Sequence, residues 1–446
     1  MKKITLPLLL VGLLFSCTKP KNQQHIDTIK AVDQWLKDVK VTSEGVSIWP
    51  DVLDEPEKVS LSLSDGVAGK LAFYLQLHKE TDNERYLAEV KLAADYILAH
   101  LPSKTDSLQS VFWAFSPYGI VCGPSFALIE TYKATGEEKY RAGAEEIIDV
   151  IHHFAINRED TLSWGLGNDV LGGLAGTALF MLYAGETLER PDLIATAEKA
   201  AGTLISRANN EAGLSWKRGQ NGRFTLPNFS HGAAGIGYFL ARLYETTQDP
   251  KHLEAALKAN VYLESIAKTD GGVFLVPYGF PDPGWSRPFD IGWAHGPAGV
   301  ARFYHQLYKV TGDMKWQERE KACLRGIVAS GIPGIPKNGD FGVEEFYLDN
   351  RFGIASVASF MLDLQSSNEG DQKLLEELID HVISKGITQN QKLFWPQARY
   401  NFMAKAGDTT AFTGYFYGAS GYGMLLLKAQ AKLNGTDFIR FVDDPY

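Results

Sequence analysis

The sequence is poor in cysteine, in positive charge and in long apolar runs. Its 446 residues contain three cysteines, which excludes a disulfide-rich scaffold and a metal site built mainly from cysteine. The formal net charge is −9, and no lysine- and arginine-rich run follows the first residues. Because nothing would neutralise several phosphates at once, we expect no nucleic-acid partner. The hydrophobic content of 45% and the charged content of 22% exclude a disordered chain.

The apolar run at the amino terminus is too short to cross a membrane. It covers residues 4–15, whereas a spanning helix needs about 20 apolar residues. The run follows Lys2 and Lys3 and is followed at once by Ser16 and Cys17. A basic start, a short apolar core and a small residue before cysteine resemble a bacterial lipoprotein signal. An ordinary secretion signal with a chance cysteine is the alternative.

The lipoprotein interpretation divides the start of the chain into two segments. We expect residues 1–16 to be removed, and residues 17–40 to form a lipidated amino terminus followed by a linker or a first helix. Lipid on Cys17 would attach the protein to a membrane of the bacterial cell envelope, outside the cytoplasm. Cys122 and Cys323 then remain, and the sequence leaves open whether they form a disulfide.

Glycine is the residue in excess, and its positions reveal a repeat. The chain has 43 glycines among 446 residues, compared with about 7% in average proteins. An anchor glycine in a glycine pair opens an apolar helical run at intervals of 53 to 65 residues. The six anchors are Gly69, Gly123, Gly176, Gly235, Gly299 and Gly421. Between the last two lies a seventh repeat, in which Gly353 is kept and Ser356 stands at the anchor position.

Each repeat has the pattern of a helical hairpin. The first helix, as in residues 71–77, is apolar on nearly all sides, which predicts burial. A second helix with one apolar stripe begins seventeen residues after each anchor. The expected second-helix starts are Tyr86, Tyr140, Leu193, His252, Trp316, Lys373 and Phe438. A buried inner ring and an amphipathic outer ring describe an all-α, seven-hairpin α/α toroid, expected as a single domain over residues 41–446.

Polar residues just before the glycine pairs predict a site at one mouth of the toroid, where equivalent helix ends converge. His231 and His295 occupy equivalent positions in adjacent repeats, so we expect them to approach each other and to transfer protons. Asp290 is expected to orient His295 or to act as a base. The ligand-binding candidates are Asn228, Trp293, Arg351, Asp169 and Tyr417. Capping and loop packing are the structural alternative for all of these side chains.

Aromatic residues also gather in the loops before the glycine pairs. Examples are Tyr278, Trp164, Trp216 and Trp395. Aromatic rings around a cavity with carboxylates would suit a sugar or a peptide. The alternative is that they pack the long loops onto the end of the toroid.

The glycine register, together with the segments SHGAAGIGYFLARLY and GWAHGPAGVARFYHQLY, resembles the lanthionine synthetase C-like family. The resemblance covers roughly residues 60–435. It implies a seven-hairpin toroid. Peptide-cyclising members of the family use zinc to activate a cysteine thiolate, which adds to a dehydrated serine or threonine. The resemblance also implies proton transfer by the histidine of the fourth repeat, which is His231 here.

The zinc ligands implied by the resemblance are absent from this sequence. The family's cysteine before the fifth glycine pair is replaced by Ala294, and its Cys-His pair in the sixth repeat by Arg351 and Phe352. Catalytic zinc needs three protein ligands, which alanine and phenylalanine cannot supply. We therefore expect no zinc cofactor, with a site formed by His231, His295 and a carboxylate as the alternative.

Three functions follow from these observations. The first is a lanthionine synthetase C-like lipoprotein that binds or modifies a peptide and has lost the zinc cyclase site. The second is a carbohydrate-active toroid enzyme, which would need two facing carboxylates from among Asp169, Asp290 and Glu344. The third is a peptide cyclase that works without the usual zinc ligands. The expected partner is accordingly a peptide or a small molecule such as a sugar.

Overall fold

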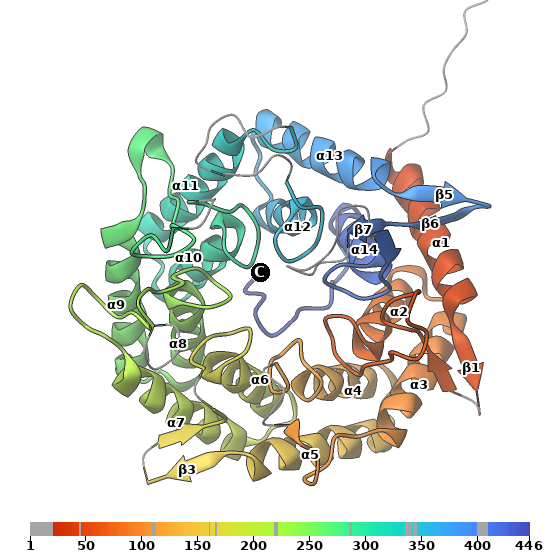
Figure 1. Ribbon diagram of the computed structural model, residues 1–446, viewed down its shortest axis with the longest axis horizontal. Coiled ribbons are helices and arrows are strands. Elements are labelled where there is room, and N and C mark those ends of the chain that lie inside the picture. Colours follow the sequence, from red (N-terminus) through yellow and green to blue (C-terminus); the bar gives the residue numbers. More distant parts are fainter. Residues whose placement is uncertain are drawn as a thin grey trace, which may run out of the picture.

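Among the described residues, fourteen α-helices form two concentric rings (Figure 1). The computed structural model describes residues 21–43, 46–108, 113–159, 161–165, 167–217, 222–284, 288–334, 341, 346–398 and 409–446. The expected signal, residues 1–16, and the expected lipidation site Cys17 lie outside these ranges. The double ring confirms the all-α toroid predicted from the glycine register.

The inner ring consists of the helices that follow the glycine pairs. Its members are α2 (Val67–Thr81), α4 (Cys122–Thr135), α6 (Leu174–Thr187), α8 (Ala233–Thr247), α10 (Pro297–Thr311), α12 (Ile354–Leu364) and α14 (Ala419–Asn434). In α2 every residue from Val67 to Leu77 is buried. The burial expected for a helix that is apolar on all sides is therefore confirmed.

The outer ring carries one apolar stripe per helix. Its members are α1 (Lys21–Val39), α3 (Glu84–Ala99), α5 (Glu138–His153), α7 (Pro191–Arg207), α9 (Pro250–Ile266), α11 (Met314–Ser330) and α13 (Glu369–Ser384). The buried residues of α3 are Tyr86, Val90, Ala93, Ala94 and Ile97, spaced at helical intervals that place them on one face. Side chains such as Asn83 and Asp249 accept backbone N–H groups at the starts of these helices, as N-caps do.

The seventh hairpin differs from the sequence expectation. No helix begins at Phe438, because residues 435–446 form an irregular tail. The outer position beside α14 is filled by α1 from the other end of the chain (Figure 1). The toroid therefore closes by joining its two chain ends, and it includes residues for which the sequence left a linker or a first helix open.

A tryptophan signature supports this placement of α1. In four repeats an indole N–H donates to a backbone carbonyl 12 or 13 residues earlier, near the end of the outer helix. The pairs are Trp49 with Leu36, Trp164 with Ile151, Trp216 with Leu204 and Trp395 with Val382, at 2.7–3.0 Å. Each indole thus satisfies a carbonyl that has no partner within the helix. The expected cavity aromatics Trp164, Trp216 and Trp395 are in this respect helix-end caps.

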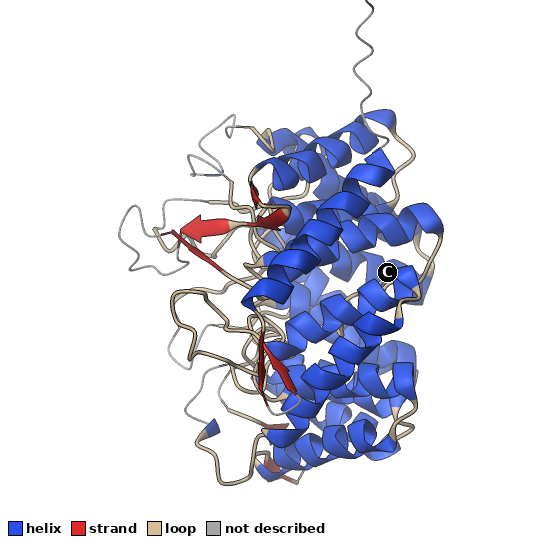
Figure 2. Cartoon of the chain, turned by 90° about the vertical axis from the view of Figure 1, so that its right-hand side faces the viewer, coloured by secondary structure: helices blue, strands red, loops and turns tan. Residues whose placement is uncertain are grey.

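Loops and short strands collect at one end of the helical rings (Figure 2). Four antiparallel two-stranded ribbons lie there. They pair β1 (Val41–Ser43) with β2 (Val46–Ile48), β3 (Ile156–Arg158) with β4 (Thr161–Ser163), β5 (Ile387–Gln389) with β6 (Lys392–Phe394), and β7 (Pro396–Ala398) with β8 (Thr409–Ala411). We call this end the mouth, and the opposite end, where short turns join inner to outer helices, the distal end.

The carboxyl-terminal tail enters the centre of the ring (Figure 1). The fully buried Asp443 accepts hydrogen bonds from the Tyr118 hydroxyl at 2.6 Å and the Trp293 indole at 2.8 Å. It also forms an ion pair with Arg302 at 3.1 Å. The tail thereby links the second repeat, through Tyr118, to the fifth repeat, through Trp293 and Arg302.

The helices and the two cysteines of the described chain bear on membrane spanning and on disulfide formation. In the described part of the chain, no helix combines the length and the apolar character that crossing a bilayer would need. Cys122 and Cys323 are both buried as free thiols, and burial raises the pKa of each thiol.

Candidate functional site: the mouth of the toroid

Backbone hydrogen bonds join the mouth loops of neighbouring repeats. The donor–acceptor pairs are Leu171 N to Ser230 O, Ser230 N to Ala294 O, Ala294 N to Arg351 O, Asn350 N to Phe416 O, Phe416 N to Ser64 O and Ser64 N to Tyr118 O, at 2.9–3.0 Å. These bonds hold successive loops in a common register. Residues at equivalent repeat positions therefore become neighbours around the mouth.

The residue four positions before each anchor defines what we call the mouth position. Its seven occupants are Asp65, Gly119, Gly172, His231, His295, Phe352 and Tyr417. Repeats two and three carry glycine there and so contribute no side chain. The polar and aromatic side chains of the mouth position come from the other five repeats.

The structure brings His231 and His295 together, with ring centroids 5.3 Å apart. His231 Nδ1 lies 3.0 Å from Asp169 Oδ2, so the carboxylate orienting His231 comes from the third repeat. Because a carboxylate oxygen only accepts, Nδ1 carries the proton and Nε2 of the neutral ring has the free lone pair. Asp169 Oδ1 also accepts the Gly172 backbone N–H at 2.7 Å, which fixes the carboxylate in place.

His295 is held between aromatic rings. Its ring stacks on Tyr278 at 4.1 Å and on Phe352 at 5.7 Å between centroids. Only 3% of His295 is exposed. These ring contacts and its burial limit the orientations that this imidazole adopts.

Two buried carboxyl groups lie in the fifth and sixth mouth loops. Asp290 Oδ1 accepts the backbone N–H of Ile291, and Asp349 Oδ1 accepts those of Arg351 and Phe352. Burial raises the pKa of Asp349 to about 6, and the negative charge of Asp290 adds to this effect. Asp349 is one of the polar residues that precede the sixth inner helix, and it stands seven residues before the Ser356 anchor position, as Asp169 does before Gly176.

Arg351 and Tyr417 also meet at the mouth. Arg351 Nη1 donates to the Tyr417 hydroxyl at 2.8 Å. The guanidinium carbon lies 4.4 Å from the Trp113 ring centroid and 4.6 Å from that of Phe352. Stacking on aromatic rings and a hydrogen bond thus hold a permanent positive charge in place.

A second cationic group in the mouth was missed by the sequence analysis. Lys70, in the first turn of α2, is fully buried and donates to the Asp65 carbonyl. Its Nζ lies 3.6 Å from Asp51 Oδ1. Burial lowers the pKa of Lys70 to about 8, while the nearby carboxylates oppose the shift. The only sequence signal was a lysine within an otherwise apolar inner helix.

Three sequence candidates are placed differently from the rest. Asn228 is fully buried, and its Nδ2 donates to the Pro277 carbonyl at 2.7 Å. The Trp293 indole is directed to Asp443 of the tail. Both side chains therefore have contacts that stabilise the loops. Glu344 lies outside the described residues.

The three positions at which the resemblance implies zinc ligands are occupied by residues with other contacts. Ala294 is fully buried, and its backbone N–H and carbonyl both bond to neighbouring loops. Phe352 stacks on His295, and Arg351 donates to Tyr417. In the described part of the chain, the residues close enough to share a metal ion are Glu198, Asp249 and His252, which belong to α7 and to the distal start of α9 rather than to the mouth.

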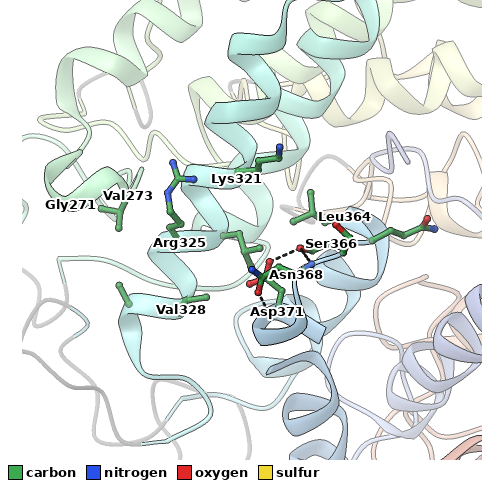
Figure 3. A pocket seen from close by; sticks show the side chains of 13 residues that line it. Gly271, Val273, Lys321, Arg325, Val328, Leu364, Ser366, Asn368 and Asp371 are labelled. Carbon is green, nitrogen blue, oxygen red and sulfur yellow. Dashed lines mark hydrogen bonds between the residues drawn. The ribbon is translucent and has the colours of Figure 1, made fainter. Parts of the chain in front are cut away.

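A groove elsewhere on the molecule has a different chemical character. It lies between the outer helices α11 and α13 and has a volume of about 800 Å³ (Figure 3). The Ser366 hydroxyl donates to the Asp371 carboxylate, and the backbone N–H of Asp371 donates to the Asn368 side chain. Arg325 donates to Gly272 and Glu318. These polar groups bond to one another, and the described residues that line the groove include no histidine, so the mouth is the stronger candidate site.

The fold and the mouth define an α/α toroid with an aspartate–histidine pair at the loop end. The model of the lanthionine synthetase C-like proteins matches residues 57–434, and the chain belongs to this family. No curated relative matches the chain.

The chain is similar to several solved structures at low sequence identity, and the first of these shares its fold. Nisin cyclase has a TM-score of 0.62 and 16% identity, covering 95% of this chain and 97% of that chain. The GH76A α-1,6-mannanase of Salegentibacter sp. HEL1_6 has a TM-score of 0.46 and 13% identity, covering 92% and 99%. An unsaturated glucuronyl hydrolase specific for heparin has a TM-score of 0.48 and 14% identity, covering 94% and 99%.

Proposed function

We propose that this protein binds a peptide at the mouth of the toroid and that His231 exchanges a proton with it, without the zinc-dependent thiol activation of the family. The observation that carries the proposal is the Asp169–His231 hydrogen bond beside His295. The matched family and the nisin cyclase neighbour support a peptide as the ligand.

The chemistry follows from the orientation of His231. Its Nε2 lone pair accepts a proton from the bound peptide, and Asp169 stabilises the imidazolium that results. The proton then returns from Nε2 to another atom of the peptide. Tyr278, which stacks on His295, supplies an adjacent aromatic surface on which a peptide side chain or backbone can pack.

The proposal gives zinc no role because of the side chains at positions 294, 351 and 352, where the resemblance implies zinc ligands. Ala294 and Phe352 carry no donor atom for a metal in their side chains, and an arginine is always protonated. The guanidinium of Arg351 would repel a cation placed near it. At these three positions the positive charge is therefore that of Arg351.

A carbohydrate ligand is the second candidate, and the Asp290–Asp349 pair favours it. An acid with a pKa of about 6 is partly protonated near neutral pH and can donate a proton to a leaving group. Tyr278 would offer an aromatic surface to a sugar ring. The same binding experiment separates the two candidates.

The test uses the mature, tag-free chain after chelator treatment. The probes are a labelled synthetic peptide with one cysteine and one dehydroalanine, the matched peptide with serine and alanine, and α-1,6-mannotriose. We expect saturable binding of the peptides, unchanged by the chelator and weakened by Tyr278→Ala. Binding of mannotriose alone would establish the carbohydrate candidate, and peptide binding that requires added zinc would contradict the zinc-free site.

Proton transfer is followed separately by counting free thiols in the bound peptide. If the thiol is consumed, its proton passes to His231, sulfur bonds to the dehydroalanine β-carbon, and the α-carbon takes a proton. His231→Gln should then abolish thiol consumption while leaving peptide affinity within about threefold. That outcome would identify a cyclase that works without the usual zinc ligands. An intact thiol in the wild type would restrict the function to binding.

We further propose that lipid on Cys17 holds the protein at a bacterial envelope membrane. The proposal rests on the sequence of residues 1–17. Metabolic labelling with a radioactive fatty acid should mark the wild type, and Cys17→Ser should lose the label and leave the membrane fraction. A wild type without label would contradict lipidation.

A further inference from the structure

A second cluster of potential metal ligands lies away from the mouth, where two repeats meet. It consists of Glu198 on α7, Asp249 at the N-cap of α9, and His252 in the first turn of α9. One ligand atom from each residue lies within 4.8 Å of the other two. Ligands bound to one small cation have separations of this order, since each metal–ligand bond measures about 2.0–2.2 Å.

His252 has an unused nitrogen in this cluster. The residue is fully buried, and Nδ1 lies 3.1 Å from the Thr247 hydroxyl. That hydroxyl donates its own proton to the Leu243 carbonyl at 2.8 Å, so it accepts the proton of Nδ1. Nε2 therefore carries a lone pair, and it is buried without a hydrogen-bond partner. A histidine that is grouped with two carboxylates and keeps a buried, unpartnered lone pair is a residue that a metal ion would satisfy.

Asp249 can bind a metal ion without losing its role as an N-cap. Its Oδ1 accepts the Lys251 backbone N–H at 3.0 Å, while its Oδ2 forms an ion pair with Lys251 Nζ at 2.7 Å. The Lys251 side chain is 57% exposed, and such surface pairs contribute little stability. A divalent cation can therefore displace the ammonium group from Oδ2 while Oδ1 remains in the cap.

We propose that Glu198, Asp249 and His252 bind a divalent transition-metal ion, with Zn²⁺ the best match. One imidazole nitrogen and two carboxylate oxygens suit zinc, and water completes the coordination. The ion would join the outer helix of the third repeat to the start of the outer helix of the fourth. This site is independent of the peptide function proposed for the mouth, and its role is to stabilise the ring.

The test measures zinc stoichiometry and thermal stability of the mature, tag-free chain after chelator treatment. Adding ZnCl₂ should restore one equivalent of bound zinc and raise Tm, whereas MgCl₂ and CaCl₂ at the same concentration should not. Glu198→Gln and His252→Leu should each weaken zinc affinity by more than about tenfold. Loss of a residue that only hydrogen-bonds to a metal ligand already costs about that much, and these two residues are proposed as ligands themselves. Leucine is a suitable replacement because Leu193 occupies the equivalent position in the preceding repeat. Lys251→Met should tighten zinc binding, since it removes the competing charge.

The fifth repeat provides a matched control. Asp313 is also an N-cap that accepts the Lys315 N–H and pairs with its ammonium group, but Trp316 stands where His252 stands in the fourth repeat. Asp313→Asn should lower Tm as Asp249→Asn does, yet leave the zinc-induced rise intact. Zinc binding that is unchanged in both Glu198→Gln and His252→Leu, or no zinc binding by the wild type, would overturn the proposal.

Discussion

The mouth end and the distal end of the toroid are built from the same helices by different local rules. At the distal end, α2 and α3 are separated by Asp82 and Asn83 alone, a left-handed C-cap followed by an N-cap. At the mouth, residues 267–296 separate α9 from α10. Short turns satisfy the helix ends locally, whereas the mouth loops depend on hydrogen bonds to other repeats. The distal end is therefore specified within each repeat, and the mouth is specified by the assembled ring.

The largest effect on stability should come from the carboxyl-terminal tail, residues 435–446, whose Asp443 contacts mouth loops and the inner helix α10. Asp443→Ala leaves the buried guanidinium of Arg302 without its partner, which should lower the free energy of unfolding by about 3–5 kcal/mol. Chemical denaturation would measure the change. The control is Asp437→Ala, at an exposed position of the same tail, where the cost should stay within about 0.5 kcal/mol. Equal costs for the two variants would show that the tail does not depend on the buried ion pair.

A pair of glycines tests the two ends directly. A Cβ at Gly235, at the mouth, would lie 1.9 Å from the Phe229 carbonyl oxygen, so Gly235→Ala should cost about 3 kcal/mol or more. Gly312, at the distal end, has a φ of 68° and open space around a Cβ. Gly312→Ala should cost about 1 kcal/mol, from backbone strain alone. The comparison fails if the distal substitution destabilises the protein as much as the mouth substitution does.

The buried carboxyl of Asp349 should make stability depend on pH. Its pKa in the folded state, about 6, exceeds the value of about 3.9 in an unfolded chain. The folded state therefore binds more protons between about pH 4 and pH 6, and this group's contribution to stability falls as pH rises through that window. Asp349→Asn should remove the contribution, so the stability difference between wild type and variant should change by roughly 2 kcal/mol from pH 4 to pH 7. A constant difference would show that Asp349 is not perturbed by burial.

The smallest effect should come from a tryptophan that caps an outer helix. Trp216→Phe keeps a ring in the buried site but removes the hydrogen bond to the Leu204 carbonyl. The loss should be about 1 kcal/mol, since a buried acceptor is left unsatisfied. Thermal unfolding would measure it. An unchanged Tm would mean that this indole contributes only its apolar surface.

Much of the fold was predictable because each repeat has the same local sequence pattern. The anchor glycines mark where each inner helix begins, and the apolar stripe of α3 marks its buried face. The same register placed His231 beside His295. The end of the seventh repeat was not predictable in this way, because the partner of α14 comes from the opposite end of the chain.

Within the mouth, the sequence pointed to residue types but not to their pairs. Asp169 orients His231 from a loop 62 residues earlier. The spacing of residues along the chain does not predict this contact. The difference between Arg351, stacked at the mouth, and Trp293, directed to the tail, is likewise invisible in their flanking residues.

Helical periodicity and glycine spacing were thus enough to define six complete hairpins and the equivalent positions along the repeats, since these depend on interactions among near neighbours in the sequence. The closure of the ring by α1, the burial of Asp443 and the pairing of Asp169 with His231 required the folded chain. Each joins segments from different repeats, and such contacts arise only when the ring brings distant loops within bonding distance.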